Sequence, residues 1–339
     1  MSEDTLSDVL RTVRLRGAVF YYVSFRGQWS AEAVASKEIG AAVLPGAEHV
    51  IEYHMIAKGE GWVGVSGVNP IRLGTGDVVM FPHGDAHVLS GAPGLQPNRM
   101  SADWVFATRS QSKPMPLSYH HGVAQPGAPM PVEDADAVVV CGFLGCDLRP
   151  FNPLVGSLPR MLHIPADKAG KWVRQVIDQA AAESRAPRPG SDVLLARISE
   201  MIFVDAVRSY VESLPAPASG WLAGLRDRYV GAALALLHNE PERAWTLDEL
   251  GKDVGLSRSA LHERFLNLTG LPPMQYLTNW RMQLASNLLR TTAATVAAVA
   301  ADVGYESEAA FSRAFKRAVG IPPAAWRRYE ELGPPVAAR

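Results

Sequence analysis

Histidines in the first third of the chain could bind a metal ion or a small ligand. His87 ends the segment GDVVMFPHGDAH (76–87), in which a short apolar run is followed by Pro82 and Gly84, residues that favour a turn. Upstream, His49 and His54 lie five residues apart in EHVIEYHMIAKGEG. Side chains alternate along a strand, so residues five apart face opposite sides. The pattern predicts one or two buried histidines and leaves a fully ligated metal ion as the alternative.

Two cysteines, Cys141 and Cys146, raise the question of redox chemistry. They lie in DAVVVCGFLGCDL (136–148), an apolar run that predicts a buried strand. Five extended steps separate their Cα atoms by about 16 Å, whereas a disulfide needs about 4.4–6.8 Å. We therefore expect two free, buried thiols that behave as small hydrophobic groups. A disulfide would require the strand to break at Gly142 or Gly145.

The last third of the chain contains an internal repeat, LDELGKDVGLSRSALHERFLNLTGLPPMQYL followed by VAAVAADVGYESEAAFSRAFKRAVGIPPAAWR. In the first copy, Thr246 is placed to cap a helix over 247–254, Gly255 to end it in a left-handed turn, and Ser257 to cap a second helix. The equivalent residues of the second copy are Thr295, Gly304 and Ser307. Each copy is therefore predicted to be a helix-turn-helix, a unit that presents its second helix to the major groove of DNA.

A helix over 273–289 is predicted to join the two copies and to fix the distance between their second helices. Two such helices enter successive major grooves on one face of DNA when they lie about 34 Å apart. A shorter separation requires the DNA to bend.

Length and composition define the elements around these motifs. With 339 residues, 47% of them hydrophobic, and a net charge of -1, the chain is long enough for two domains with separate cores. Apolar runs broken by glycine before residue 150 predict antiparallel strands. Apolar residues spaced three and four apart over 166–185 and 191–213 predict a helix pair. The proline-rich LPAPASG (214–220) is predicted to be a linker.

The same composition excludes several function classes. Two cysteines argue against a disulfide scaffold and fit a reducing compartment. The chain has no apolar run of about 18 residues, which predicts that it has no membrane span. The charged start MSEDTLSDVLRTVRLRG lacks the apolar core of a signal peptide. We therefore expect a soluble, cytoplasmic protein.

Residues 221–330 resemble the DNA-binding domain of AraC/XylS-family transcriptional regulators, on GLSRSALHERF, GLPPMQYL and VGYESEAAFSRAFKRAVGIPPAAWR. The resemblance implies promoter recognition by one helix in each copy. Its base-reading positions fall on Ser259, His262, Glu263, Glu308, Ala309, Ser312 and Arg313. Its phosphate contacts are expected from Arg258, Arg264, Arg281, Lys316 and Arg317. Arg313 is the best candidate for a bidentate contact to guanine, whereas Glu263, acidic where some members are basic, would accept from cytosine N4.

Residues 8–215 are similar to the cupin-type sensor half of one AraC subgroup, through the motif at 76–87 and the pieces VVVCGFLGCDL and NPLVGSLPRMLHI. The predicted fold is therefore α+β. It has an N-terminal cupin-like β-barrel with a helix pair (1–213), the linker 214–220, and an all-α domain with two helix-turn-helix motifs (221–334). The candidate effector pocket contains His54, His87 and Cys141.

These resemblances imply a sequence-specific transcriptional regulator, an activator by family, that binds double-stranded promoter DNA and contacts RNA polymerase. Its sensor would respond to a small molecule or a stress signal, and the helix pair would form a homodimer. The alternative is a metal-dependent cupin enzyme with an appended DNA-binding domain. The absence of a His-x-His motif followed by glutamate argues against it. We predict no catalytic residue, metal or cofactor.

Overall fold

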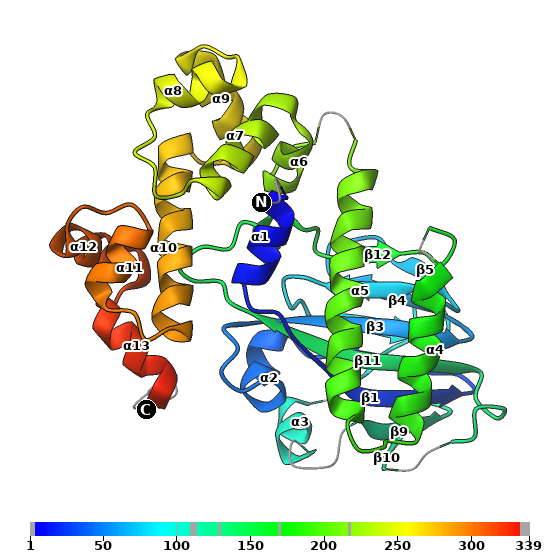
Figure 1. The fold of residues 1–339 in the computed structure, drawn as a ribbon. Coiled ribbons are helices and arrows are strands. Elements are labelled where there is room, and N and C mark those ends of the chain that lie inside the picture. Colours follow the sequence, from blue (N-terminus) through cyan, green and yellow to red (C-terminus); the bar gives the residue numbers. More distant parts are fainter. Residues whose placement is uncertain are drawn as a thin grey trace. The chain divides into compact units, whose positions relative to one another are not determined.

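The computed structural model describes residues 4–99, 101–108, 114–127, 130–168, 171–215 and 218–332. Its contacts divide the chain into two compact units. Figure 1 shows the fold, with colours that follow the sequence. The sheet unit contains residues 15–147 and 158–213, and the helical unit contains residues 1–14, 148–157 and 214–339. The sequence predicts a single division at 214–220, whereas these units each combine separate segments of the chain. Residues 216–217 of the predicted linker and 333–334 of the predicted DNA-binding domain lie outside the described residues.

The sheet unit contains two sheets. The seven-stranded sheet has the order β10-β9-β1-β11-β3-β6-β12, and the five-stranded sheet has the order β5-β4-β7-β2-β8. The strands of the first are β1 (Arg16–Arg26), β3 (His49–Lys58), β6 (Val78–Phe81), β9 (Met115–His120), β10 (Val123–Pro126), β11 (Ala137–Cys146) and β12 (Leu162–Ile164). Those of the second are β2 (Ser30–Ala33), β4 (Glu60–Val65), β5 (Ile71–Gly74), β7 (His87–Ser90) and β8 (Asn98–Arg99). All pairings are antiparallel except β1 with β9 and β2 with β8.

One hydrophobic core joins the inner faces of the two sheets. It combines Val139 and Phe81 of the seven-stranded sheet with Val63 and Leu89 of the five-stranded sheet. The α+β class is confirmed, but the strands do not close into the barrel expected from the sequence. No described strand pairing connects the outer strands of one sheet to those of the other, so each sheet keeps free edges.

The helices that the structure describes in the sheet unit are α2 (Ser36–Val43), α3 (Ala102–Thr108), α4 (Lys171–Arg185) and α5 (Ser191–Ser213). Figure 1 shows α4 and α5 lying across the seven-stranded sheet, where α5 packs on β1. Gly17 allows this close approach, because a Cβ there would lie 2.4 Å from the carbonyl oxygen of Ala196. The predicted helix over 191–213 is confirmed, whereas the first helix of the pair begins at Lys171 and not at 166.

The helical unit is built around α10. Its helices are α1 (Thr5–Thr12), α6 (Trp221–Arg226), α7 (Arg228–Asn239), α8 (Leu247–Val254), α9 (Arg258–Thr269), α10 (Pro273–Thr291), α11 (Val296–Asp302), α12 (Glu308–Val319) and α13 (Pro323–Leu332), with a 3-10 turn at Val155–Ser157. Among the described residues, no helix combines the length and the apolar character that crossing a membrane requires.

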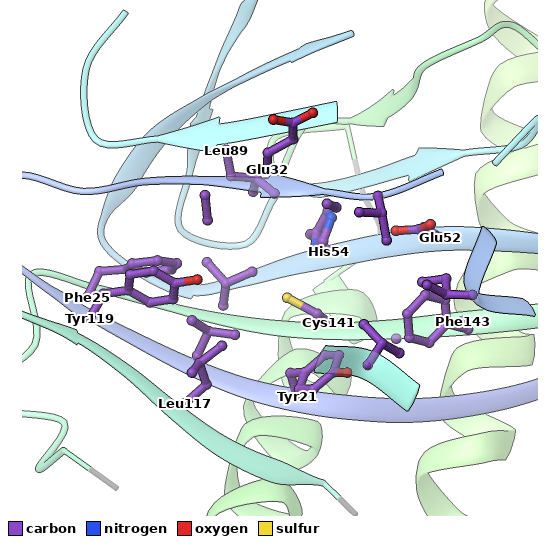
Figure 2. Close-up of a pocket in the computed structure, with 18 residues that line it drawn as sticks. Tyr21, Phe25, Glu32, Glu52, His54, Leu89, Leu117, Tyr119, Cys141 and Phe143 are labelled. Atoms are coloured by element: carbon purple, nitrogen blue, oxygen red, sulfur yellow. The ribbon is translucent and has the colours of Figure 1, made fainter. Parts of the chain in front are cut away.

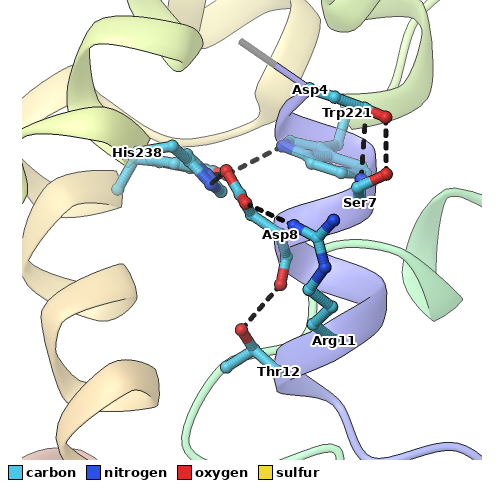
Figure 3. Close-up of polar contacts among 8 residues, drawn as sticks. Asp4, Ser7, Asp8, Arg11, Thr12, Trp221 and His238 are labelled. Atoms are coloured by element: carbon cyan, nitrogen blue, oxygen red, sulfur yellow. Dashed lines mark hydrogen bonds and ion pairs between the residues drawn. The ribbon is translucent and has the colours of Figure 1, made fainter. Parts of the chain in front are cut away.

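The N-terminal helix α1 packs on α7 and α10 within the helical unit. Asp4 caps α1 by accepting a hydrogen bond from the Ser7 backbone, and Asp8 Oδ2 lies 3.8 Å from His238 Nδ1 of α7 (Figure 3). The other ring nitrogen of His238 lies 2.8 Å from Tyr276 Oη, which also accepts from Trp221 Nε1 at 2.9 Å. Asp8 of the N-terminal helix and residues of α6, α7 and α10 therefore share one polar cluster.

Candidate DNA-reading surface and effector cavity

The first helix-turn-helix is formed by α8 and α9. Thr246 caps α8 in a reciprocal capping box with Glu249, and Gly255 ends the helix at φ 80°. Ser257 then caps α9 through the backbone nitrogen of Ala260. Leu261 and Phe265 are fully buried, so the opposite face of α9 is left exposed.

The second helix-turn-helix, α11 and α12, repeats this local chemistry. Thr295 caps α11, Gly304 takes φ 78° in the turn, and Ser307 caps α12. Phe311 and Phe315 are fully buried in the core of this motif. The capping residues and glycine turns predicted from the sequence are therefore confirmed in both copies.

The predicted base-reading residues lie on the outer faces of α9 and α12. The exposed members are Ser259, His262, Glu263, Glu308, Ala309 and Arg313, and Ser312 is half-buried. The side chain of Arg313 forms no hydrogen bond or ion pair with any residue that the structure describes. These side chains are free to meet base edges in the major groove.

Four of the five predicted phosphate contacts, Arg258, Arg264, Lys316 and Arg317, are exposed, and Arg281 is half-buried. Lys316 and Arg317 follow Arg313 along α12 and are open to solvent. Arg258 at the start of α9 pairs with Asp248 at 3.4 Å, with 67% and 70% of the two side chains exposed. Such an exposed pair contributes little to stability and opens readily for a phosphate.

Arg264 has a partner within the helical unit. Its Nε lies 3.0 Å from both carboxylate oxygens of Asp227, the residue whose side chain caps α7. The Arg264 hydrogen bonds hold the pKa of Asp227 below its ordinary value. The guanidinium also lies 5.6 Å from the ring centre of Tyr229. Arg264 therefore links α9 to the start of α7, an arrangement that its position in the sequence did not predict.

Arg281 of α10 holds the loop between α7 and α8. Its Nε donates to the carbonyl oxygen of Pro241 at 2.5 Å, and Nη2 donates to that of Arg243 at 2.8 Å. Partial burial lowers the pKa of its guanidinium. A Cβ on Gly304 would lie 2.4 Å from the carbonyl oxygen of Glu242, so the second turn touches the same loop. Arg281 is thus placed where the two motifs meet.

The helix α10 connects the two motifs. Trp280 is buried against His238 of α7, with ring centres 4.0 Å apart, and Met282, Ala285 and Leu289 are buried in the core of the second motif. Nineteen residues give α10 a length of about 28 Å. In Figure 1, α8 and α9 lie near one end of α10, and α11 and α12 lie beside its other half.

The sheet unit contains a cavity of about 70 Å³ between its sheets. Figure 2 shows His54 and Glu52 on β3 beside Cys141 on β11. Cys141 stands directly opposite His54 in the β11–β3 pairing and opposite Tyr21 in the β1–β11 pairing. These four residues share the inner face of the sheet, because cross-strand neighbours point to the same side.

His54 lines this cavity and contacts His87, which is not among the residues that line it. Their Nε2 atoms lie 2.6 Å apart, and His87 Nδ1 lies 2.9 Å from the carbonyl oxygen of Asp85. Burial lowers the pKa of His87 to about 4 and that of His54 well below its ordinary value, so both rings are neutral at pH 7. Of the three residues predicted to form an effector pocket, His54 and Cys141 line the cavity, and His87 contacts His54.

The donor set does not fit the metal site of an enzymatic cupin. Among the described residues, no group of three or more histidine, cysteine, aspartate or glutamate side chains could hold a metal ion. His49 faces away from His54 and bonds to the carbonyl oxygen of Pro82 at 2.6 Å. Two histidines alone are fewer than the three protein ligands of a catalytic site.

Both cysteines are free thiols on one continuous strand, as predicted. Burial raises the pKa of the Cys141 thiol and raises that of Cys146 to about 12. Neither thiol is therefore activated as a thiolate at neutral pH. Cys146 is buried, whereas Cys141 is half-buried and lines the cavity.

Sequence reasoning missed Glu52, which is 2% exposed and lines the cavity. Ser36 Oγ donates to its Oε1 at 2.8 Å, and burial raises the pKa of the carboxyl group to about 8. The alternation of side chains along a strand could have identified Glu52, because it precedes His54 by two residues and must share its face of the strand.

Comparison with known proteins agrees with this arrangement. A cupin family model matches residues 4–212, and a helix-turn-helix domain model matches residues 250–329. A putative AraC-like transcription regulator of Streptomyces lividans is 32% identical over 97% of this chain and 99% of its own length. A second putative AraC-like transcription regulator, from Streptomyces antibioticus, is 30% identical over 96% of this chain and 99% of its own length.

Among solved structures, the DNA-binding domain of AdpA in complex with a target DNA is 30% identical, with a TM-score of 0.30. It covers 31% of this chain and 96% of that domain. The matches to whole regulators extend over both units, and the cupin model alone covers more than half of the chain. The chain therefore belongs to the family of AraC-like transcription regulators with an N-terminal cupin domain, and it acts as a DNA-binding regulator and not as an enzyme.

Proposed function

We propose that this regulator acts in the cytoplasm as a homodimer, reads promoter DNA with α9 and α12, and changes its DNA binding when an effector fills the sheet-unit cavity. The observation that carries the proposal is the pair of capped second helices with polar, exposed faces. Because activation is the usual role in this family, the bound protein would activate transcription by contacting RNA polymerase.

Arg313 is proposed as the main base-reading residue of α12. Its guanidinium is exposed and has no partner among the described residues, so binding guanine O6 and N7 requires no internal bond to break. The same major groove would also be contacted by Ser312, Ala309 and Glu308. On α9, Ser259, His262 and Glu263 would form the corresponding reading face.

Arg258, Lys316 and Arg317 are proposed to contact phosphates. Arg264 and Arg281 would act first within the protein, because their guanidinium groups already bind Asp227 and the loop carbonyls. The helix α10, about 28 Å long, holds α9 and α12 at a fixed separation, and a separation below the roughly 34 Å between successive major grooves requires bent DNA. We therefore expect the bound DNA to bend, which circularly permuted probes can measure by gel mobility.

A second copy of the chain is proposed to cover the outer face of α5. Val193, Leu194 and Met201 are 60%, 40% and 51% exposed there, unusually open for large apolar side chains. The double variant Val193→Glu, Met201→Glu should sediment as a monomer. Val123→Glu is the matched control, because Val123 is 62% exposed on β10, away from α5.

The deciding experiment is genome-wide footprinting with purified protein, followed by titration of one recovered site. Arg313→Ala should cost about 1–3 kcal/mol at that site and relax the preference at one base pair. Lys316→Ala should weaken all sequences alike and lower the salt dependence by about one charge. Arg174→Ala in α4 is the control and should change neither quantity. Unchanged affinity of Arg313→Ala for the site would refute the assigned reading face.

A further inference from the structure

One buried amide in α10 contacts two segments that come from the first half of the chain. Gln283 is fully buried, and its Oε1 accepts a hydrogen bond from the backbone nitrogen of Phe151 at 3.0 Å. Its Nε2 lies 3.5 Å from the carbonyl oxygen of Thr12, at the outer limit of a hydrogen bond. Both segments belong to the helical unit, so all of these contacts lie within one unit.

The same two segments are continuous with two neighbouring strands of the sheet unit. Thr12 ends α1, the helix that precedes β1 in the chain, and Phe151 lies in the segment that follows β11. Strands β1 and β11 pair with each other, and Tyr21 of β1 stands opposite Cys141 of β11 where both line the cavity. The backbone therefore leads from both of these cavity-lining strands to Gln283.

Gln283 lies where α10 passes from one helix-turn-helix to the other. One turn before it, Trp280 stacks on His238 of α7, a helix that contacts both α8 and α9. On its other side, Met282 and Ala285 belong to the core of the second motif. Because α10 is one continuous helix, a displacement at Gln283 changes how α9 and α12 are presented to DNA.

The contacts of Gln283 are costly to break. Its side chain is fully buried, so loss of the Phe151 N–H would leave the amide oxygen without a donor and away from water. The ring of Phe151 also packs edge-on against Tyr276 of α10, with ring centres 5.3 Å apart. In the same segment, Leu154 is buried as well. The segment after β11 is therefore held on α10 by a hydrogen bond and by apolar packing.

We propose that Gln283 is a positioning residue through which the cavity-lining strands β1 and β11 and the DNA-reading helices influence one another. A displacement of either strand reaches α10 through Thr12 or Phe151. In return, DNA held by α9 and α12 restrains both strands, because coupling between two sites is reciprocal. This inference rests on the proposed reading of DNA by α9 and α12 and on the effector role of the cavity, and it adds the path by which the two are coupled.

The test measures amide hydrogen exchange of the full chain with and without a saturating DNA site recovered by footprinting. Reciprocal coupling makes the effector itself unnecessary. In the unaltered chain, DNA should slow exchange in β1 and β11 at least about fivefold. In Gln283→Met, which has a side chain of similar length and lacks both polar contacts, DNA should still bind but this protection should be lost.

A matched control separates coupling from a structural role. Gln275→Met makes the same change on the same helix, where Gln275 is exposed and donates to Asn279, and it should respond to DNA as the unaltered chain does. A purely structural role of Gln283 would lower the midpoint of urea unfolding in Gln283→Met and leave the DNA-dependent protection of β1 and β11 in place.

Two results would overturn the inference: unchanged exchange in β1 and β11 when the unaltered chain binds DNA, or the same DNA-dependent protection in Gln283→Met as in the unaltered chain. Should Gln283→Met not fold, Gln283→Asn replaces it, because its amide is one carbon shorter and cannot reach both backbone groups. Absence of any footprinted site would refute the proposed function together with this inference. DNA binding without protection of β1 and β11 would refute the inference alone.

Discussion

Replacing Gly304 by alanine should destabilise the helical unit more than the same change at Gly255. Both glycines occupy the turn of a helix-turn-helix with positive φ, 78° and 80°. Around Gly255, a new Cβ meets nothing within 4 Å. At Gly304 it would lie 2.4 Å from the carbonyl oxygen and 2.8 Å from the Cα of Glu242. The two sites therefore share the backbone strain but differ in the space available.

The magnitudes follow from this difference. A non-glycine residue in the left-handed region costs about 1–2 kcal/mol, and the restricted unfolded chain returns about 0.4–1 kcal/mol. Gly255→Ala should therefore cost about 1 kcal/mol. Gly304→Ala adds an overlap with backbone atoms, which cannot rotate away, and overpacking of this kind costs about 1–3 kcal/mol more. Its total should be about 2–4 kcal/mol.

Urea unfolding of the full chain measures both costs, and hydrogen exchange of α8, α9, α11 and α12 locates them. Protection should fall across α11 and α12 in Gly304→Ala, while Gly255→Ala should affect α8 and α9 mildly. Equal destabilisation by the two substitutions, within about 0.5 kcal/mol, would mean that Gly304 does not approach Glu242 in solution.

Three further outcomes are expected. Arg281→Lys keeps the charge and should lower affinity for a two-groove DNA site about tenfold, because lysine cannot form the bidentate contact with the loop carbonyls; unchanged affinity would contradict this positioning role. Arg264→Ala should cost about 0.5–1 kcal/mol in urea unfolding, since half of the Arg264 side chain is exposed; a large loss of DNA affinity at unchanged stability would contradict the internal role. From pH 6.5 to 8, stability should fall by up to about 1.4 kcal/mol per pH unit, because native Glu52 keeps its proton up to about pH 8 whereas the unfolded group loses it near its ordinary value of 4.5. Glu52→Gln should flatten this slope and Glu60→Gln should not. The window starts at pH 6.5 because the lowered pKa of His87 produces the opposite slope below that point.

The helix-turn-helix motifs could be predicted because their determinants are local. A cap such as Thr246 or Ser307 satisfies backbone nitrogens two or three residues away, and a turn glycine acts on its own φ angle. These signals stay within a few positions of sequence. For the same reason the boundaries of α8 and α5 agree with the sequence pattern within a residue.

The partners of Arg264, Arg281 and Glu52 could not be predicted, because each depends on contacts distant in sequence. Arg264 lies 37 residues from Asp227, and Arg281 lies 40 residues from Pro241. From sequence alone, an arginine on a helix of a DNA-binding domain is interpreted as a phosphate contact, because the acceptors on neighbouring elements are not known. Sheet closure also depends on register between distant strands, which alternation alone does not specify.

The arrangement of the two units along the chain has a consequence for dissecting the protein. The polypeptide passes between them four times, near residues 14, 147, 157 and 213. A fragment that starts at the proline-rich segment would lack α1 and residues 148–157, and would leave the polar cluster around His238 partly uncovered. One proteolytic nick in that segment would still leave three covalent connections. Any movement of one unit relative to the other must therefore change the backbone conformation at all four crossing segments together.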